Sequence, residues 1–220
     1  MLLSKKRIAM FGLLIMIIVF LTGCVETVAF EDKKVERIIR KGINKMSGEL
    51  TQEELSYIIE LELPSRSISS LKGLEYVVNL EVLSLLPNEI SDISPLNKLV
   101  YLEELYIHKN QISDINSLSN LTNLDTLYIV ENKITDITAL SNLKELEILN
   151  LAFNDVTDIT PLTNLNKLEI LNLNYTKITN IKPLLKMTSL KELYLTGIDN
   201  LDMKTVELLR NKGVEVYLDI

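Results

Sequence analysis

Hydrophobic residues recur along this chain with a period of 22 residues, from about Ile58 to Leu195. Three columns of the repeat hold leucine in every copy, and further columns hold leucine, isoleucine or valine. The leucine columns are Leu83, Leu105, Leu127, Leu149, Leu171 and Leu193; Leu80, Leu102, Leu124, Leu146, Leu168 and Leu190; and Leu74, Leu96, Leu118, Leu140, Leu162 and Leu184. A fixed period of this length predicts units that bury their apolar faces by stacking on one another.

Each copy contains a short segment in which inward and outward positions alternate, as in Leu149-Asn150-Leu151. This alternation is typical of a β-strand. Stacked copies therefore predict a parallel sheet on one wall of the molecule. When the in-phase segment Leu61-Glu62-Leu63 is included, seven strands stack, and at roughly 4.8 Å per strand the sheet is on the order of 30 Å wide.

The consensus of the copies, L-x-x-L-x-L-x-x-N-x-I-x-D-I-x-P-L-x-x-L-x-x, is the leucine-rich repeat signature, and its length lies within the range of that architecture. The predicted fold is an α/β leucine-rich repeat solenoid. We expect a curved parallel sheet on the concave face, short helical or 3-10 turns on the convex side and a helical N-terminal cap. The repeats are assigned to residues 67–198.

An asparagine column follows each strand, and it comprises Asn88, Asn110, Asn132 and Asn154. A backbone that turns sharply out of a buried strand leaves N–H and C=O groups unpaired. A stack of side-chain amides offers each coil a donor and an acceptor. We therefore interpret the column as structural, and expect the last turns to be looser because Thr176 replaces the amide.

A column of aspartates precedes the I-x-P-L segment of the return side, and it comprises Asp92, Asp114, Asp136 and Asp158. Aspartate is a good cap for a short helical turn, and proline suits the first residues of such a turn. A row of carboxylates is also compatible with calcium, although each position offers fewer oxygens than the six to eight that this ion takes. The sequence leaves cation binding by this column open.

The first residues form a separate segment, which we interpret as a signal peptide over residues 1–23. Lys5, Lys6 and Arg7 precede an uncharged apolar stretch that is too short to span a membrane comfortably. The segment ends in Leu-Thr-Gly-Cys24, which resembles the lipobox of bacterial lipoproteins. The resemblance implies cleavage before Cys24, a diacylglycerol thioether on its sulfur and acyl chains such as palmitate.

Cys24 is the only cysteine, so it has no disulfide partner within the chain. The alternative is an inert cysteine in an ordinary cleaved signal or an uncleaved anchor. If Cys24 is lipidated, residues 24–29 form the anchor and a tether of roughly 20 Å at most. The expected location is then the extracytoplasmic face of the bacterial cell membrane.

Solenoids need terminal caps that hide the core of the first and last coils. Residues 30–66 predict a helical N-terminal cap leading into the first strand, and the motif Thr51-x-x-Glu54 reads as a capping box. The apolar side of the predicted first helix comprises Val35, Ile38, Ile39, Ile43 and Met46. Residues 199–220 predict a C-terminal cap, with a helix over 200–211 and a final strand over 214–218. We expect the repeat domain to be the whole mature protein.

The composition offers little for catalysis or for nucleic acid. Without Lys5, Lys6 and Arg7 the chain has 20 Lys plus Arg against 30 Asp plus Glu, and a net charge near minus ten disfavours nucleic acid and anionic membrane surfaces. His108 is the only histidine, and no phosphate-binding glycine motif occurs. We therefore predict no enzymatic activity, no metal site and no cofactor.

Residues that the solenoid pattern leaves free are the candidates for binding. The outward positions of the predicted strands and the positions that border them carry rings and aliphatic side chains with few charges, which is the composition of an interface centre. The candidate partner-binding residues are Tyr106, His108, Tyr128, Val130, Ile148, Phe153, Ile170, Tyr175 and Tyr194. The alternative is that the rings simply cover the sheet, because tyrosine is a good strand residue.

The repeat with its I-x-D-I-x-P-L segment, together with the cap that opens near Phe30-Glu31-Asp32, resembles the internalin-like leucine-rich repeats of Gram-positive bacteria. The resemblance covers roughly residues 30–220 and implies a non-enzymatic protein that binds a protein or peptide ligand through its concave face. The chain departs from that family in being short and in having a lipobox where many members have a sorting tail. The competing interpretation is a structural envelope subunit that interacts through its caps or convex side.

Overall fold

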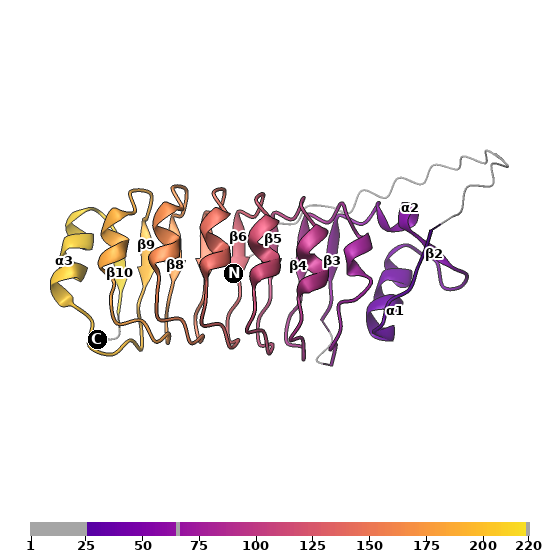
Figure 1. Cartoon of the computed structure of the whole chain (residues 1–220), viewed down its shortest axis with the longest axis horizontal. Coiled ribbons are helices and arrows are strands. Elements are labelled where there is room, and N and C mark those ends of the chain that lie inside the picture. The colour runs from indigo at the N-terminus through magenta and orange to yellow at the C-terminus, as the bar shows by residue number, and fades with distance from the viewer. Residues whose placement is uncertain (1–25, 65–66, 219–220) are drawn as a thin grey trace.

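The computed structural model describes residues 26–64 and 67–218, and the predicted signal peptide and Cys24 lie outside these residues. The described chain forms an elongated row of coils with a helix at each end (Figure 1). A helix at the N-terminal end covers the first coil, and a helix at the C-terminal end covers the last. None of the helices in the described part of the chain is long and apolar enough to cross a membrane.

A parallel sheet of eight strands, in the order β10 to β3, forms one wall of the row. Its strands are β3 (Glu60–Glu62), β4 (Val82–Ser84), β5 (Glu104–Tyr106), β6 (Thr126–Tyr128), β7 (Ile148–Asn150), β8 (Ile170–Asn172), β9 (Glu192–Tyr194) and β10 (Glu215–Tyr217). From β3 to β9 each residue pairs with the residue 22 positions later, as Leu61 does with Leu83. The predicted repeat strands and the predicted terminal strand thus join in one sheet.

Short 3-10 turns form the opposite wall and lie in a row in front of the sheet in Figure 1. These turns are η1 (Leu74–Tyr76), η2 (Ser94–Lys98), η3 (Asn116–Asn120), η4 (Thr138–Asn142), η5 (Thr160–Asn164) and η6 (Lys182–Lys186). Proline stands in the first turn of η2, η5 and η6, where its fixed φ suits the conformation. The alternation of strand and turn confirms the predicted solenoid.

The leucine columns fill the space between the two walls. Leu83, Leu105, Leu127, Leu149, Leu171 and Leu193 point inward from the strands, and each has 0% of its surface exposed. The columns ending at Leu184 and Leu190 are likewise buried throughout. Each coil therefore buries its apolar side chains against its neighbours, as expected for a repeat that cannot form a core alone.

The N-terminal cap differs from the prediction in two places. Strand β1 (Thr27–Val28) pairs antiparallel with β2 (Leu50–Thr51), and Val28 is buried, so the folded cap begins inside the segment predicted as a tether over 24–29. Helix α1 (Lys33–Gly42) ends before Met46, which is 69% exposed instead of packing inward. A pairing between two-residue strands leaves no periodic signal in the sequence, which accounts for the first error.

Both caps also contain predicted features. The short helix α2 (Gln52–Leu55) begins with the predicted capping box, in which the Thr51 hydroxyl accepts from the Glu54 backbone and the Glu54 carboxylate accepts from the Thr51 backbone. At the other end, α3 (Met203–Asn211) is capped by Asp202. Val206 and Leu209 of α3 close the core, whereas Met203 and Leu208 are exposed.

Candidate binding surface

The asparagine column connects neighbouring coils and holds the turn after each strand in place. The Asn110 Oδ1 accepts from the Ile90 backbone N–H at 3.1 Å, and its Nδ2 donates to the carbonyl oxygens of Leu85 and His108 at 3.1 and 2.9 Å. Equivalent bonds are made by Asn88 in the coil before and by Asn132 and Asn154 in the two coils after. Each amide thus satisfies three backbone groups near the edge of the sheet.

Thr176 takes the next position of this column, and its side chain makes fewer hydrogen bonds than the asparagines. Its hydroxyl donates to the Leu173 carbonyl at 2.7 Å. No bond from this side chain to Val156 N, the group equivalent to Ile134 N in the previous coil, occurs among the described residues. The Thr176 side chain therefore makes fewer hydrogen bonds to the backbone than each of the four asparagines before it.

The aspartate column caps the 3-10 turns. In Asp136, Oδ1 accepts from the Thr138 backbone at 2.8 Å and from its hydroxyl at 2.6 Å, and the hydroxyl bond is the main cause of the lowered pKa of this carboxyl. Asp92, Asp114 and Asp158 accept the equivalent backbone bond at 2.8 Å. The structure shows no group of three or more potential metal ligands within the described residues.

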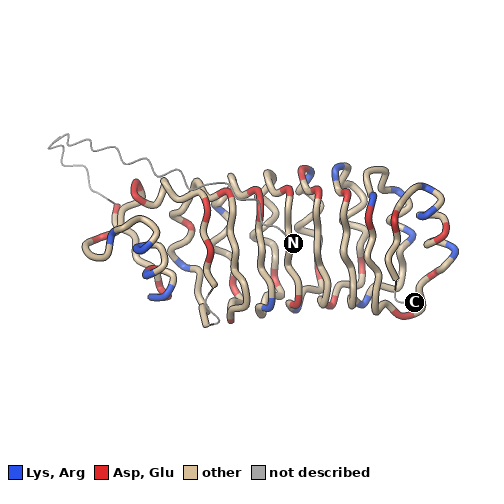
Figure 2. The backbone as a smooth tube through the Cα atoms, turned by 180° about the vertical axis from the view of Figure 1, so that it is seen from behind, with Lys and Arg blue, Asp and Glu red and all other residues tan. Residues whose placement is uncertain are grey.

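The sheet face, which we define as the outward side of strands β3 to β10, carries five of the predicted binding residues, namely Tyr106, Tyr128, Ile148, Ile170 and Tyr194. The other four, His108, Val130, Phe153 and Tyr175, lie in the segments that follow the strands. Figure 2 views the molecule from this side, opposite to the row of turns. Within the eight strands its outward positions include no lysine or arginine, whereas five of them are glutamate. The five are Glu60, Glu62, Glu104, Glu192 and Glu215. The strands alone would therefore make this face anionic.

A first ring cluster lies on β5, β6 and the residues that follow them. The ring centroids of Tyr106 and Tyr128 are 5.4 Å apart, and the His108 ring lies 5.9 Å from Tyr128. The Tyr106 hydroxyl donates to Glu104 Oε2 at 2.7 Å. Burial raises the pKa of both tyrosines and lowers that of His108, so the cluster is neutral at pH 7.

A second ring pair lies in the turns after β7 and β8. The Phe153 and Tyr175 rings stack at 4.5 Å, and the two side chains are 49% and 47% exposed. Both residues have left-handed backbones, with φ of 57° and 55°, a conformation that is costly for bulky side chains. The Tyr175 ring leans over Gly197, where an added Cβ would come within 2.3 Å of the ring.

A third ring pair, Tyr194 and Tyr217, lies at the C-terminal end of the sheet. Of the two residues, only Tyr194 was predicted. Tyr194 stacks on Tyr217 at 4.5 Å, and each hydroxyl donates to the glutamate two residues earlier on its strand at 2.7 Å. The bond to Glu192 raises the pKa of Tyr194 to about 12. Tyr217 was missed, although the motif Glu-x-Tyr that it shares with Tyr106 and Tyr194 is visible in the sequence.

The predicted binding residues thus form separate groups on one face. Val130, Ile148 and Ile170 lie half-buried between the ring clusters. Asn150 and Asn172 pair across β7 and β8, and each oxygen accepts from a backbone N–H two residues later. The strands in the middle of the face are consequently neutral, with aliphatic and amide groups. The first and third ring clusters lie to either side of these strands, and the second lies in the turns that follow them.

The single histidine provides a test of the first cluster. Because the folded pKa of His108 lies below its usual 6.5, the unfolded chain binds a proton before the folded chain does as the pH falls. We therefore expect stability to be lost as the pH falls from 6.5 through the lower folded pKa, and expect His108→Gln to abolish this part of the pH dependence. Proton NMR of the only imidazole gives the folded pKa, and a value at or above 6.5 would contradict the burial that we describe.

Comparison with known proteins agrees with this geometry. The family model for leucine rich repeats (2 copies) matches residues 78–120, 102–142, 122–164 and 144–184. Together with the stacked coils of strand and 3-10 turn, this match shows that the fold is a leucine-rich repeat solenoid. A search of curated proteins found no match.

The solved structures similar to this chain include two from Listeria monocytogenes. An internalin (inlF) is 37% identical, with a TM-score of 0.80, over 86% of this chain and 56% of that chain. Internalin C2 (inlC2) is 29% identical, with a TM-score of 0.67, over 86% of this chain and 94% of that chain. The chain is thus similar to these internalins over most of its own length, and it spans just over half the length of inlF.

A third similar structure shares the fold of this chain but has a lower sequence identity. A leucine-rich repeat protein of Leptospira interrogans has a TM-score of 0.60 over 76% of this chain and 50% of that chain. Its sequence identity is 24%, so the likeness concerns the solenoid alone.

Proposed function

We propose that the protein is a non-enzymatic binding protein, anchored to the membrane through a lipid on Cys24, which binds another protein or peptide on its sheet face. The observation that carries the proposal is the set of three ring clusters on the sheet face and in the turns that border it. Aromatic side chains of this kind supply most of the binding energy at protein interfaces. Phe153 and Tyr175 support the proposal further, because strained backbones of this kind cluster at functional sites.

The charge of the sheet face favours a basic partner. Five glutamates and no lysine or arginine point outward from the strands, so a cationic ligand would be attracted and an anionic one repelled. A tyrosine ring beside a carboxylate, as in Tyr106 with Glu104, suits an arginine, whose guanidinium stacks on aromatic faces and pairs with carboxylates. Binding to such a partner should weaken as salt is added.

The anchoring part of the proposal has its support in the sequence. A basic segment, an apolar stretch and the motif Leu-Thr-Gly-Cys24 stand directly before the cap. An extracytoplasmic location would leave the sheet face free to meet other envelope proteins or proteins outside the cell.

A comparison of captured proteins tests the binding face. The chain from residue 25 to 220 and a variant with Tyr106, Tyr128, Phe153 and Tyr175 changed to alanine are crosslinked in envelope and host extracts. We expect the variant to lose at least about tenfold in capture, because removal of hot-spot rings costs more than 1 kcal/mol each. The captured protein is then titrated against both forms at two salt concentrations.

The matched control changes Tyr57 and Tyr101, two exposed tyrosines outside the sheet face, to alanine. Circular dichroism checks that all three proteins are folded. Equal capture by the quadruple variant and the unchanged chain would exclude the sheet face and favour a structural subunit that interacts through its caps or convex side.

A further inference from the structure

One long edge of the solenoid carries an apolar patch that neither the core nor the sheet face explains. Tyr57 and Tyr101 are 74% and 56% exposed in the loops before β3 and β5. Together with three exposed aliphatic residues in the same loops and in the loop before β4, they form what we call the edge patch. The edge patch comprises Tyr57, Ile59, Val78, Val100 and Tyr101.

The edge patch extends over the first three coils, with Asn79 at the position equivalent to Tyr57 and Tyr101 in the coil between them. Asn79 Nδ2 donates to the Ser56 carbonyl at 2.8 Å, which joins the loops before β3 and β4. The backbone N–H of Glu81 donates to the Ile59 carbonyl, and that of Glu103 to the Glu81 carbonyl, both at 2.8 Å. The five side chains therefore lie on neighbouring loops of one edge.

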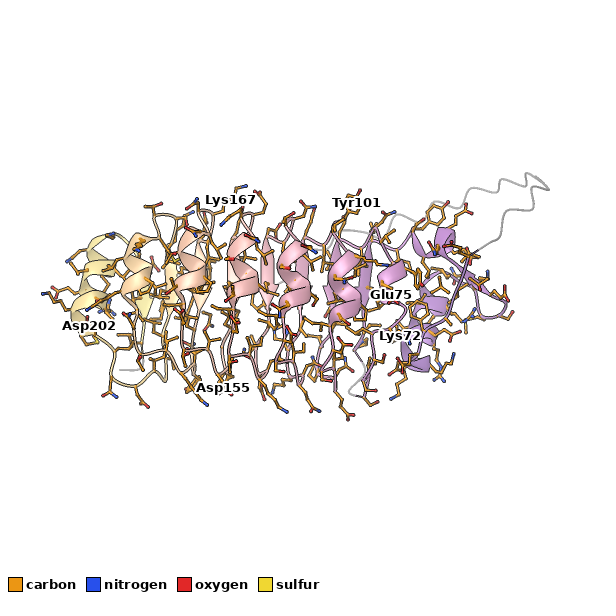
Figure 3. All side chains as sticks on the ribbon, in the orientation of Figure 1. Lys72, Glu75, Tyr101, Asp155, Lys167 and Asp202 are labelled. Atoms are coloured by element: carbon orange, nitrogen blue, oxygen red, sulfur yellow. The ribbon has the colours of Figure 1, made fainter. Side chains whose placement is uncertain are left out.

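Later coils replace this apolar character with polar residues at the same positions. The two positions occupied by Val100 and Tyr101 become, coil by coil, Thr122 and Asn123, Lys144 and Glu145, Asn166 and Lys167, and Thr188 and Ser189. Since the same loop folds in every coil, the solenoid does not require the apolar residues. Figure 3 shows Tyr101 and Lys167 on the same edge, one at the apolar part and the other at the polar part.

The edge patch lies beside the point at which the described chain begins. The Glu26 carbonyl accepts from the Gln52 backbone at 3.3 Å, and Gln52 opens α2, which leads directly to Tyr57. Only Val25 separates Glu26 from Cys24, so at about 3.5 Å per residue Cys24 reaches at most about 7 Å from Glu26. A lipid on Cys24 would therefore bring this part of the molecule to the bilayer surface.

We infer that the edge patch rests on the lipid surface, with the tyrosine rings at the headgroup level and the aliphatic side chains turned toward the acyl chains. Tyrosine has an apolar body and a polar tip, and it is enriched at membrane–water interfaces for that reason. The inference rests on the proposed anchoring of Cys24. It adds an orientation, in which the N-terminal part of one edge meets the membrane.

The charges around the edge patch define the lipid surface that fits it. Glu81 and Glu103 are exposed in the same loops, and they would be repelled by anionic headgroups. Contact is therefore driven by apolar burial and is expected to be stronger on zwitterionic phosphatidylcholine than on membranes rich in phosphatidylglycerol.

The absence of tryptophan from the chain allows a direct measurement. The chain from Cys24 onward is coupled through its only thiol to a maleimide lipid in phosphatidylcholine vesicles with brominated acyl chains, which quench nearby tryptophan. Tyr101→Trp reports on the edge patch. Asp155→Trp is the matched control, because Figure 3 places Asp155 on the edge opposite to Tyr101 and its side chain is 45% exposed.

We expect bromine to quench the Tyr101→Trp fluorescence at least about twofold more than the Asp155→Trp fluorescence. Changing Val78 and Val100 to threonine in the Tyr101→Trp chain should remove most of this difference. Threonine occupies the same position in two later coils, at Thr122 and Thr188, so the fold should tolerate the change, which circular dichroism checks. Equal quenching of the two reporters would overturn the inference, and so would quenching that the threonine substitutions leave unchanged.

Two further measurements distinguish membrane contact by the edge patch from lipidation in cells and from dimerisation. Chemical coupling makes the vesicle experiment independent of whether cells lipidate Cys24, which metabolic labelling with a fatty acid tests beside a Cys24→Ser control. Sedimentation of the uncoupled chain tests whether a second copy covers the edge patch instead. A dimer that the Val78 and Val100 substitutions dissociate would overturn the membrane assignment and leave the proposed sheet-face function untouched.

Discussion

Replacing Leu127 with alanine is expected to lower the free energy of unfolding by about 3 kcal/mol. Leu127 points inward from β6 in the middle of the solenoid, and its side chain is 0% exposed. The substitution removes buried methyl groups and leaves a cavity between two coils that cannot collapse without displacing both. Urea unfolding followed by circular dichroism measures the loss.

The neighbouring position supplies the control. Thr126 points outward from the same strand and is half-buried, so Thr126→Ala should change the free energy of unfolding by less than about 1 kcal/mol. Because each coil contacts only its neighbours, the Leu127 variant should also unfold less cooperatively, with a broader transition. A Leu127 variant as stable as the Thr126 variant would refute the inward orientation of the leucine column.

The second large effect is expected at Asn154. Changing this residue to leucine should destabilise the protein by about 3 kcal/mol, because Ile134 N and the Ile129 and Leu151 carbonyls lose their partner while they remain buried. Urea unfolding of the two chains gives the difference. A decrease in the free energy of unfolding below about 1 kcal/mol would mean that water replaces the amide. The asparagine column would then not be what stabilises the turn.

The reverse change at Thr176 completes this test. Thr176→Asn should raise stability by about 1 kcal/mol, because the longer amide restores a bond to Val156 N that the hydroxyl does not make. A loss of stability in Asn154→Leu together with a gain in Thr176→Asn would show that the asparagine bonds stabilise every coil of the repeat. A destabilised Thr176→Asn chain would show instead that the fifth turn has a different geometry.

The repeats could be predicted from sequence because one column serves one structural role in every coil. Leu83 and Leu193 lie 110 residues apart and occupy the same inward position, so each copy tests the assignment of the others. The caps have no such internal replicate. The β1–β2 pairing and the early end of α1 depend on contacts between single segments, and those contacts leave no pattern in the chain.

The binding surface was predictable in its location but not in its detail. Alternation within the strands identifies which residues face outward, and this suffices for Tyr106 and Tyr128. The left-handed backbone of Phe153 and Tyr175 could not be foreseen, because aromatic residues disfavour that conformation and the preceding coils place Lys109 and Glu131 there. Tertiary packing of the turn fixes the backbone conformation at this position, whichever side chain it carries.

The constant offset of 22 residues between paired strands has a consequence for how such a protein changes over time. A duplication of one whole 22-residue segment adds a row to the sheet and leaves every existing pair in register, whereas an insertion of a single residue within a strand reverses which side chains face inward. The sheet face can therefore gain or lose whole strands. Its ring clusters can move apart or together by that means without any change to the caps.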